Sequence, residues 1–400
     1  MIRPSWLSRT LLLALVVGAA CKGGDEGKQA ASNTFRIGVV TSLTGSQAAF
    51  GQAHKNGYSV ALAEINAKGG VHGKQIELVY YDDQSKPDQA VQGVAKLVDQ
   101  DHVPLILGGF SSENTRAMIP AVTAKKVPLI MPTATADNVM ETGSTWVYRI
   151  CGGSSSYAGA TVGFLKETGA KTIAIVYENT NFGQANAKAM KELAAGAGMS
   201  VIDEEAYQAN SPDYKALLQR VKSNNPDVVY FASYLLDATT LMRQSAQVGL
   251  NPKYVTSAGT GFAAPEFPTE KQAGKYAEYT YSVSQWMATS KYPGSQEFDA
   301  AFTKLSGAHP AYHGMEAYAT LVVAADAISR AKTEDSAAIS EAIRATKLTT
   351  PFGPIEFDAK GQNPHQILIT QVQGGQYKVV WPGDQAEAKP VPTPAWDDRH

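Results

Sequence analysis

The chain has 400 residues, of which 44% are hydrophobic, enough to bury the cores of two or three domains. Its formal net charge at pH 7 is -2, from 35 basic and 37 acidic residues. Because there is no basic surplus to neutralise phosphates, we expect no nucleic-acid partner. The two cysteines, Cys21 and Cys151, do not make a disulfide framework or a cysteine-based zinc site.

The N-terminus has the layout of an export signal. Two arginines precede an apolar run at 11–17, which is followed by Gly18, two alanines and Cys21. The run is too short to span a bilayer, and small residues before a cysteine are similar to a lipobox, which predicts acylation of Cys21. Lipoboxes usually have leucine where Gly18 stands, so the alternative is ordinary signal cleavage beside an incidental cysteine. We expect 1–21 to be the signal peptide.

The segments that flank the body have different compositions from it. Residues 22–34 are rich in Gly, Lys, Glu, Ala and Ser without apolar periodicity, which predicts a flexible tether. Residues 383–400 are polar and proline-rich, and we expect a loose tail. A lipid anchor and a tether would hold the body outside the cytoplasm, in the periplasm or at the cell surface.

Between these ends, short β-branched runs alternate with longer amphipathic ones. The first set predicts strands at 35–40, 75–82, 104–108 and 128–131 and helices at 51–68, 86–100 and 115–126. The second set predicts strands at 171–177, 200–207, 227–232 and 253–257 and helices at 183–197, 213–224 and 238–248. This order indicates parallel sheets covered by helices. Two such sets predict an α/β protein with two doubly wound lobes, to which a strand near 279–283 and a helix at 314–330 are added.

The loops after the predicted strands indicate where a ligand binds. In open parallel sheets, ligands bind beyond the carboxyl ends of the strands, near helix N-termini that suit a carboxylate. Small hydroxyl residues follow first-lobe strands at 109–115 and 132–137, while an aromatic and an acid follow second-lobe strands at 178–183 and 232–237. Together these loops predict a clamp for a zwitterion. Each residue also has a structural alternative as a helix N-cap or a core residue.

Catalytic motifs are absent from the sequence. It contains no HExxH, GxSxG or CxxC pattern. The glycine-rich stretch at 69–74 follows a predicted helix and has no Ser or Thr after Lys74, so it predicts a turn and not a phosphate loop. We therefore expect a binding protein with no enzymatic activity, cofactor or metal.

Several long strings, in order from 37 to 362, are similar to those of a known family. They are IGVVTSLTGSQAAFGQ, AEINAKGGVHGKQIELVYYDDQSKP, LGGFSSENTRAMIPAV, VPLIMPTAT, VYENTNFGQ, DVVYFASYLLDATTLMRQSAQVGL and FGPIEFDAKGQ. They resemble the Leu/Ile/Val-binding proteins, which are type I periplasmic solute-binding proteins. The resemblance implies two α/β lobes joined by three crossover strands. It places lobe I at 35–152 and 284–348, and lobe II at 153–283 and 349–382.

The resemblance also implies a function and the roles of individual residues. The expected function is the substrate-binding component of an ABC importer, a monomer with a branched-chain or other neutral amino acid as ligand and a membrane permease as partner. By position, Ser112 is expected to hold the ligand carboxylate, Thr133 and Thr135 the carboxylate and ammonium, and Asp237 the ammonium. The alternatives are a ligand sensor, against which the export signal argues, and a binder of amides or small carboxylates.

The same alignment completes the expected binding set. It adds Phe50, Ser111, Ala134, Phe182, Tyr234 and Trp286. Phe50 and Phe182 stand where the family usually has tyrosines, which makes the expected site more apolar. Ser111 stands where the family has one cysteine of a disulfide, so that bond is absent from this chain.

Overall fold

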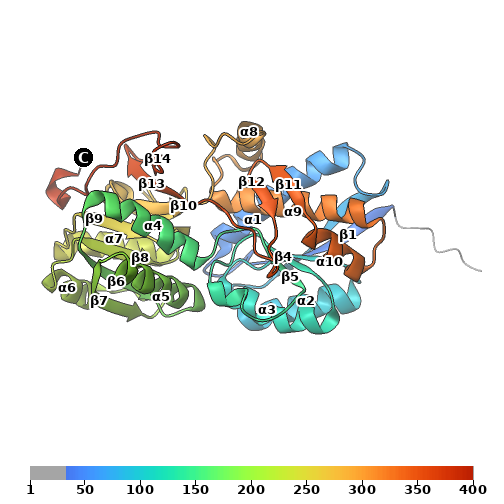
Figure 1. Cartoon of the computed structure of the whole chain (residues 1–400), viewed down its shortest axis with the longest axis horizontal. Helices are drawn as coiled ribbons and strands as arrows, with labels where there is room; N and C mark the ends of the chain where they lie inside the picture. The colour runs from blue at the N-terminus through green and yellow to red at the C-terminus, as the bar shows by residue number, and fades with distance from the viewer. Residues whose placement is uncertain (1–32, 400) are drawn as a thin grey trace, which may run out of the picture.

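The computed structural model describes residues 33–399, which form two α/β lobes lying side by side (Figure 1). The predicted signal peptide, Cys21 and nearly all of the tether lie outside the described residues. Within 33–399, no helix is both long and apolar enough to cross a membrane.

The first lobe is built on a five-stranded parallel sheet. Its elements are β1 (Thr34–Thr41), α1 (Ala48–Ala67), β2 (Gln75–Asp82), α2 (Pro87–Ala95), a π-helical turn (Lys96–Gln100), β3 (Ile106–Gly108), α3 (Ser112–Lys125), β4 (Leu129–Met131), a 3-10 turn (Asp137–Val139) and β5 (Val147–Arg149). The strand order is β2-β1-β3-β4-β5, and every neighbouring pair is parallel. Most predicted elements are confirmed to within a few residues, but β5 was not predicted.

The second lobe repeats this plan with a four-stranded parallel sheet. Its elements are α4 (Ser154–Thr168), β6 (Thr172–Glu178), α5 (Asn181–Gly196), β7 (Ser200–Tyr207), α6 (Lys215–Ser223), β8 (Val228–Ala232), α7 (Leu235–Val248), β9 (Tyr254–Ser257) and two 3-10 turns (Thr260–Ala263 and Gly274–Ala277). The strand order is β7-β6-β8-β9. The two-lobed α/β fold predicted from the sequence is therefore confirmed.

After the second lobe, the chain returns to the first and then crosses back. From β10 (Tyr281–Ser284) it passes into α8 (Ser295–Ser306), α9 (Tyr312–Ala331), α10 (Ser336–Arg344) and a hairpin of β11 (Lys347–Thr350) and β12 (Gly353–Glu356). It ends with β13 (Leu368–Gln373), β14 (Gln376–Trp381) and a 3-10 turn (Trp396–Asp398). The antiparallel sheet β10-β13-β14 joins the second lobe.

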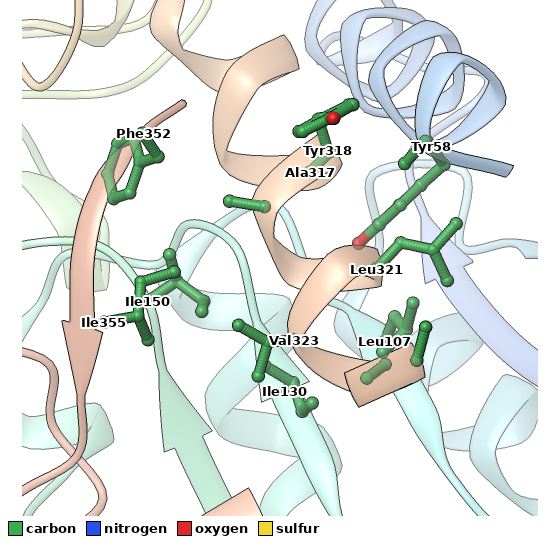
Figure 2. Packing of buried hydrophobic residues seen from close by; sticks show 14 of the residues in the cluster. Tyr58, Leu107, Ile130, Ile150, Ala317, Tyr318, Leu321, Val323, Phe352 and Ile355 are labelled. Carbon is green, nitrogen blue, oxygen red and sulfur yellow. The ribbon is translucent and has the colours of Figure 1, made fainter. Parts of the chain in front are cut away.

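The third crossover lies later in the chain than the sequence implied. The expected boundary placed 349–382 in the second lobe, but Phe352, Ile355 and Phe357 are buried in the core of the first. Figure 2 shows Phe352 and Ile355 beside the helix and strands of that core. The apolar side chains of the hairpin are buried against the apolar residues of the first-lobe core. The chain leaves the first lobe only after Asn363, whose side-chain amide donates to the carbonyl of Ile150 (3.0 Å).

The three crossover segments are hydrogen-bonded to one another. Gly152 in the first donates its N–H to Oε1 of Gln285 in the second, at 2.6 Å. His365 in the third donates from Nε2 to the Gln285 carbonyl, at 2.7 Å. The side-chain amide of Gln285 donates in turn to the Tyr157 hydroxyl, at 2.7 Å. One glutamine therefore joins all three connections between the lobes.

The C-terminal segment is docked on the second lobe, so the expectation of a loose tail is wrong. Prolines stand at every second position from 390 to 394, so only the two residues between them have a backbone N–H group. Both of these N–H groups donate hydrogen bonds to the second lobe. Val391 donates to Oε1 of Gln371 (3.0 Å), and Thr393 donates to the carbonyl of Lys253 (2.8 Å). The Trp396 indole donates to the Leu250 carbonyl at 2.8 Å. A proline-rich composition predicts an extended backbone, but an extended segment can still be hydrogen-bonded to the rest of the protein.

The core of the first lobe depends on a close approach of α1 and α9. Figure 2 shows α9 side chains, such as Leu321 and Val323, between Tyr58 of α1 and the sheet residues Leu107 and Ile130. At the crossing, a Cβ added to Gly57 would lie 2.0 Å from the carbonyl oxygen of Gly314. Only a residue without a Cβ allows this spacing.

We predict that Gly57→Ala destabilises the protein, because the added methyl group must push two packed helices apart. The expected loss in the free energy of unfolding is about 1–3 kcal/mol. The control is Gly159→Ala on α4, where no described atom outside the neighbouring residues and the local helix backbone lies within 4 Å of the added Cβ. That change should stabilise by about 0.5–1 kcal/mol. Urea titrations of both variants measure the difference, and equal stabilities would contradict the proposed crossing.

Candidate ligand-binding site

A buried cavity lies where the strand ends of the two lobes face each other. It is lined by Phe110, Ser112, Thr133, Ala134, Thr135, Tyr157, Phe182, Tyr234, Thr260, Gln285, Tyr312, His313 and Glu316. The free space is about 10 Å³ for the centre of a water-sized sphere. That is room for roughly one water molecule, so a larger ligand enters only if the lobes or the lining rings separate.

Two loops of the first lobe form one wall of the cavity, and hydrogen bonds hold them together. The Thr133 hydroxyl proton is shared between the carbonyls of Gly109 (3.1 Å) and Phe110 (2.9 Å). In the opposite direction, Ala136 donates its N–H to the Ser112 hydroxyl at 3.1 Å. Ser111 caps α3 by accepting the N–H of Asn114, also at 3.1 Å. The loop after β3 and the loop after β4 therefore act as a single braced unit.

A buried arginine fixes the shape of the second of these loops. Nη1 of Arg149 donates to the carbonyls of Ala134 and Ala136, each at 3.0 Å, and Nη2 lies 3.6 Å from Asp137. Ala134 adopts a left-handed backbone conformation with φ of 75°, which is strained for a residue with a Cβ. The guanidinium needs acceptors because it is buried, and the turned carbonyls supply them.

Aromatic rings from both lobes meet at the cavity. On the first lobe, Phe110 stacks on Phe50 with 4.5 Å between the ring centroids. On the second lobe, Phe182 stacks on Tyr234 at 5.1 Å. The two stacks touch, since the centroids of Phe110 and Tyr234 are 5.8 Å apart. These rings give the cavity an apolar wall to which both lobes contribute.

Burial shifts the pKa values of the polar side chains around the rings toward their uncharged forms. Burial lowers the pKa of His54 to about 3 and that of His313 well below its ordinary value. Burial also raises the pKa of Glu178 to about 8, and its two oxygens accept hydrogen bonds from the Thr180 hydroxyl and the Tyr234 N–H. Burial raises the pKa of Glu316 well above its ordinary value.

Comparison with known proteins identifies the family. A model of periplasmic binding proteins matches residues 34–376. The chain belongs to the periplasmic binding protein family. It is 29% identical over 353 residues to the leucine-, isoleucine-, valine-, threonine- and alanine-binding protein of Pseudomonas aeruginosa, covering 88% of this chain and 93% of that protein.

Solved structures of this family have the same fold. The branched-chain amino acid binding protein LivJ of Streptococcus pneumoniae, in complex with isoleucine, is 25% identical. It matches with a TM-score of 0.80 over 90% of this chain and 100% of that chain. A solute-binding protein of an ABC transporter from R. palustris, in complex with benzoate, matches with a TM-score of 0.79 at 19% identity, over 90% and 98% of the two chains. The latter likeness concerns the fold alone.

The cavity of this periplasmic binding protein contains six of the residues expected from the sequence. They are Ser112, Thr133, Ala134, Thr135, Phe182 and Tyr234. Two further expected residues lie directly behind the lining: Phe50 supports Phe110, and Ser111 caps the helix that carries Ser112. The strand-end rule pointed to the loops that carry these residues, because the carboxyl ends of parallel strands share one edge, and the family resemblance selected the individual residues.

Asp237 and Trp286 lie elsewhere, which corrects the expectation that they face the ligand. Both carboxylate oxygens of Asp237 accept the N–H of Asn210 (3.0 and 3.1 Å), and one accepts the Tyr214 hydroxyl (2.7 Å). Asp237 is in the first turn of α7, and its carboxylate accepts hydrogen bonds from the loop before α6. Trp286 packs on Phe298 in the first-lobe core and donates to the Ser295 hydroxyl.

Seven lining residues were missed from the sequence. They are Phe110, Tyr157, Thr260, Gln285, Tyr312, His313 and Glu316. Phe110 and Thr260 follow strands, so the strand-end rule had the signal for them. The signal for Glu316 is weaker but real, since it is the one acid between 312 and 325, in a helix stretch that is otherwise small, apolar or aromatic. Within 33–399, no group of three His, Cys, Asp or Glu side chains is placed to hold a metal ion.

We predict unequal effects on stability for the substitution of two neighbouring threonines. Thr133→Val leaves two buried carbonyls without their donor and should lower the free energy of unfolding by about 1–3 kcal/mol. Thr135→Val should change it by less than about 1 kcal/mol, because the buried Thr135 hydroxyl has no partner among the described residues. Urea titration of the ligand-free proteins measures both. Equal losses would mean that the bond from Thr133 does not brace the loops.

Proposed function

We propose that this chain is the substrate-binding component of an ABC importer, and that it captures a neutral amino acid with an apolar side chain between its lobes. The observation that carries this is the buried cavity between the lobes, in which hydroxyl groups lie on one wall and aromatic rings on another. A zwitterion needs polar partners when it loses water, and an apolar side chain gains from contact with rings. The amino-acid ligands named for the relatives support the same class.

The carboxylate of the ligand is proposed to bind at the braced loops of the first lobe. The Thr135 hydroxyl is buried in the cavity without a partner in the described chain, so it is free to donate. Ser112 begins α3, where backbone N–H groups and the helix dipole favour an anion. The rings of Phe182 and Tyr234 then cover the ligand from the second lobe as the lobes close.

A small aromatic carboxylate is the second candidate ligand. The observation that favours it is the stack of rings from both lobes, which suits a flat apolar body. Asp237 is not among the lining residues, so its charge does not oppose a ligand that has a carboxylate and no ammonium. We propose a membrane permease as the partner and a monomeric state for the protein. The proposed role is transport and not ligand sensing.

A thermal-shift panel of the twenty amino acids, small amides, urea and aromatic acids tests the proposed ligand class. We expect neutral apolar amino acids to raise Tm most, because a ligand that binds only the folded state stabilises it. Thr135→Val should weaken the best amino acid about 10-fold or more, since a hydrogen bond to a charged group contributes about 1.5–3 kcal/mol. A panel in which only benzoates or amides raise Tm would overturn the amino-acid proposal.

We further propose that acylation of Cys21 anchors the protein to a membrane. The support is the apolar run and small residues that precede this cysteine in the sequence. Cys21→Ser should move the protein from the membrane fraction to the soluble fraction and leave ligand affinity unchanged. A wild-type protein that is found soluble, with its mature N-terminus at another residue, would contradict the anchor.

A further inference from the structure

Glu316 is a buried acid that no other residue of the described chain satisfies. It lies in the middle of α9, its side chain is fully buried, and it lines the cavity. Neither carboxylate oxygen has a hydrogen-bond partner within 33–399. Buried polar groups are nearly always paired, and an unpaired buried carboxyl carries a large desolvation penalty. Its setting therefore points to a partner that arrives from outside.

The surroundings of Glu316 supply no free cation. Glu316 acts electrostatically on four titratable groups, which lie on α1, the first crossover, α4 and α9 itself: Tyr58, Cys151, Tyr157 and Tyr312. Burial raises the pKa of each, so none is ionised at neutral pH. The two nearby histidines, His54 and His313, are kept neutral by burial, as described above.

Among the described residues, the other elements packed on α9 also supply no free positive charge to Glu316. β3 and β4 contain no titratable residue. On α10, Arg344 lies over the ring of Tyr148, and on β11, Lys347 pairs with Glu356 at the surface. The buried Arg149, which acts on Cys151, is already bound to two carbonyls and to Asp137.

We propose that Glu316 binds the ammonium group of the ligand and releases its own proton to solvent when the ligand enters. This rests on the proposed function and deepens it: the site takes a zwitterion whose two charged ends are both held by the first lobe. The carboxylate lies at the Ser112 and Thr135 loops, and the ammonium replaces the acid's proton as the neutralising charge. The second lobe then contributes the rings of Phe182 and Tyr234 and encloses the ligand.

Proton release gives the binding a defined pH dependence. Burial raises the pKa of Glu316 and so favours the protonated acid in the empty site, while in the proposed loaded site Glu316 is a carboxylate. The two states then differ by one proton, so affinity rises with pH, by up to about tenfold per pH unit. A ligand with a carboxylate but no ammonium leaves Glu316 protonated and shows no such slope.

Isothermal calorimetry of the full chain tests the inference. The probe is L-leucine, or whichever of the twenty amino acids gives the largest thermal shift, titrated in phosphate and in Tris between pH 5.5 and 8. The variant is Glu316→Gln, which keeps the shape of the side chain and removes its charge. The matched controls are Asp237→Asn and Glu178→Gln, two other buried acids outside the cavity lining. The deaminated analogue 4-methylpentanoate is titrated in parallel.

The wild type should release close to one proton per ligand and bind more tightly at higher pH. Glu316→Gln should lose at least tenfold in amino-acid affinity together with both effects, and it should still bind 4-methylpentanoate as the wild type does. Glu178→Gln and Asp237→Asn should keep both effects. Glu178→Gln is the stricter control, because burial raises the pKa of Glu178 to about 8, at the upper end of the pH range of the titrations.

Two results would overturn the inference and are distinguishable from a failure of the proposed function. If the wild type binds an amino acid without releasing a proton, or if Glu316→Gln binds it unchanged, the role of Glu316 is wrong and the amino-acid function stands. If the wild type binds none of the twenty amino acids, the proposed function is wrong and the inference falls with it. Because the proton count is measured on the wild type, a variant that fails to fold does not decide the outcome.

Discussion

The two-lobed form depends on the hydrogen bonds of Gln285. Its side-chain oxygen accepts from Gly152 and its carbonyl accepts from His365, so one residue joins the three segments that cross between the lobes. Its amide also donates to Tyr157 on the cavity wall. Segments tied in this way turn together, which confines the relative motion of the lobes to a short hinge. The same residue therefore connects the hinge with the ligand site.

The first lobe is the rigid half of the site. Thr133, Ser112 and the buried Arg149 fix two loops against each other, and the glycine contact between α1 and α9 fixes the helix that carries Glu316. The polar groups that would meet the charged ends of a ligand are thus preorganised. The second lobe contributes Phe182 and Tyr234, whose contacts are apolar and tolerate small shifts. This division suits a protein in which one lobe recognises the ligand and the other closes over it.

Asp237 and Glu316 show why a sequence motif alone does not locate the acid that lines the cavity. Asp237 is in the first turn of the helix that follows β8, where an acid is expected to face a ligand, yet its carboxylate accepts hydrogen bonds from Asn210 and Tyr214. Glu316 has no motif around it, but the fold leaves its oxygens unpaired inside the cavity. Which acid is left without a partner at the cavity is decided by the hydrogen-bond donors that the rest of the described chain offers to each.

The sequence by itself determined the two-lobed α/β fold and the strand-end loops that reach the cavity, because these follow from local periodicity and from the shared edge of parallel strands. The family resemblance added the eight individual residues that lie at or directly behind the cavity wall. The tertiary structure decided what depends on contacts between distant segments. It placed the β11–β12 hairpin in the first lobe, where Phe352 finds an apolar face, and it docked the proline-rich end through Val391 and Thr393. It also brought Gln285 and Glu316 to the cavity, since the path of the chain between the lobes and the packing of α9 are set by long-range contacts that no local pattern encodes.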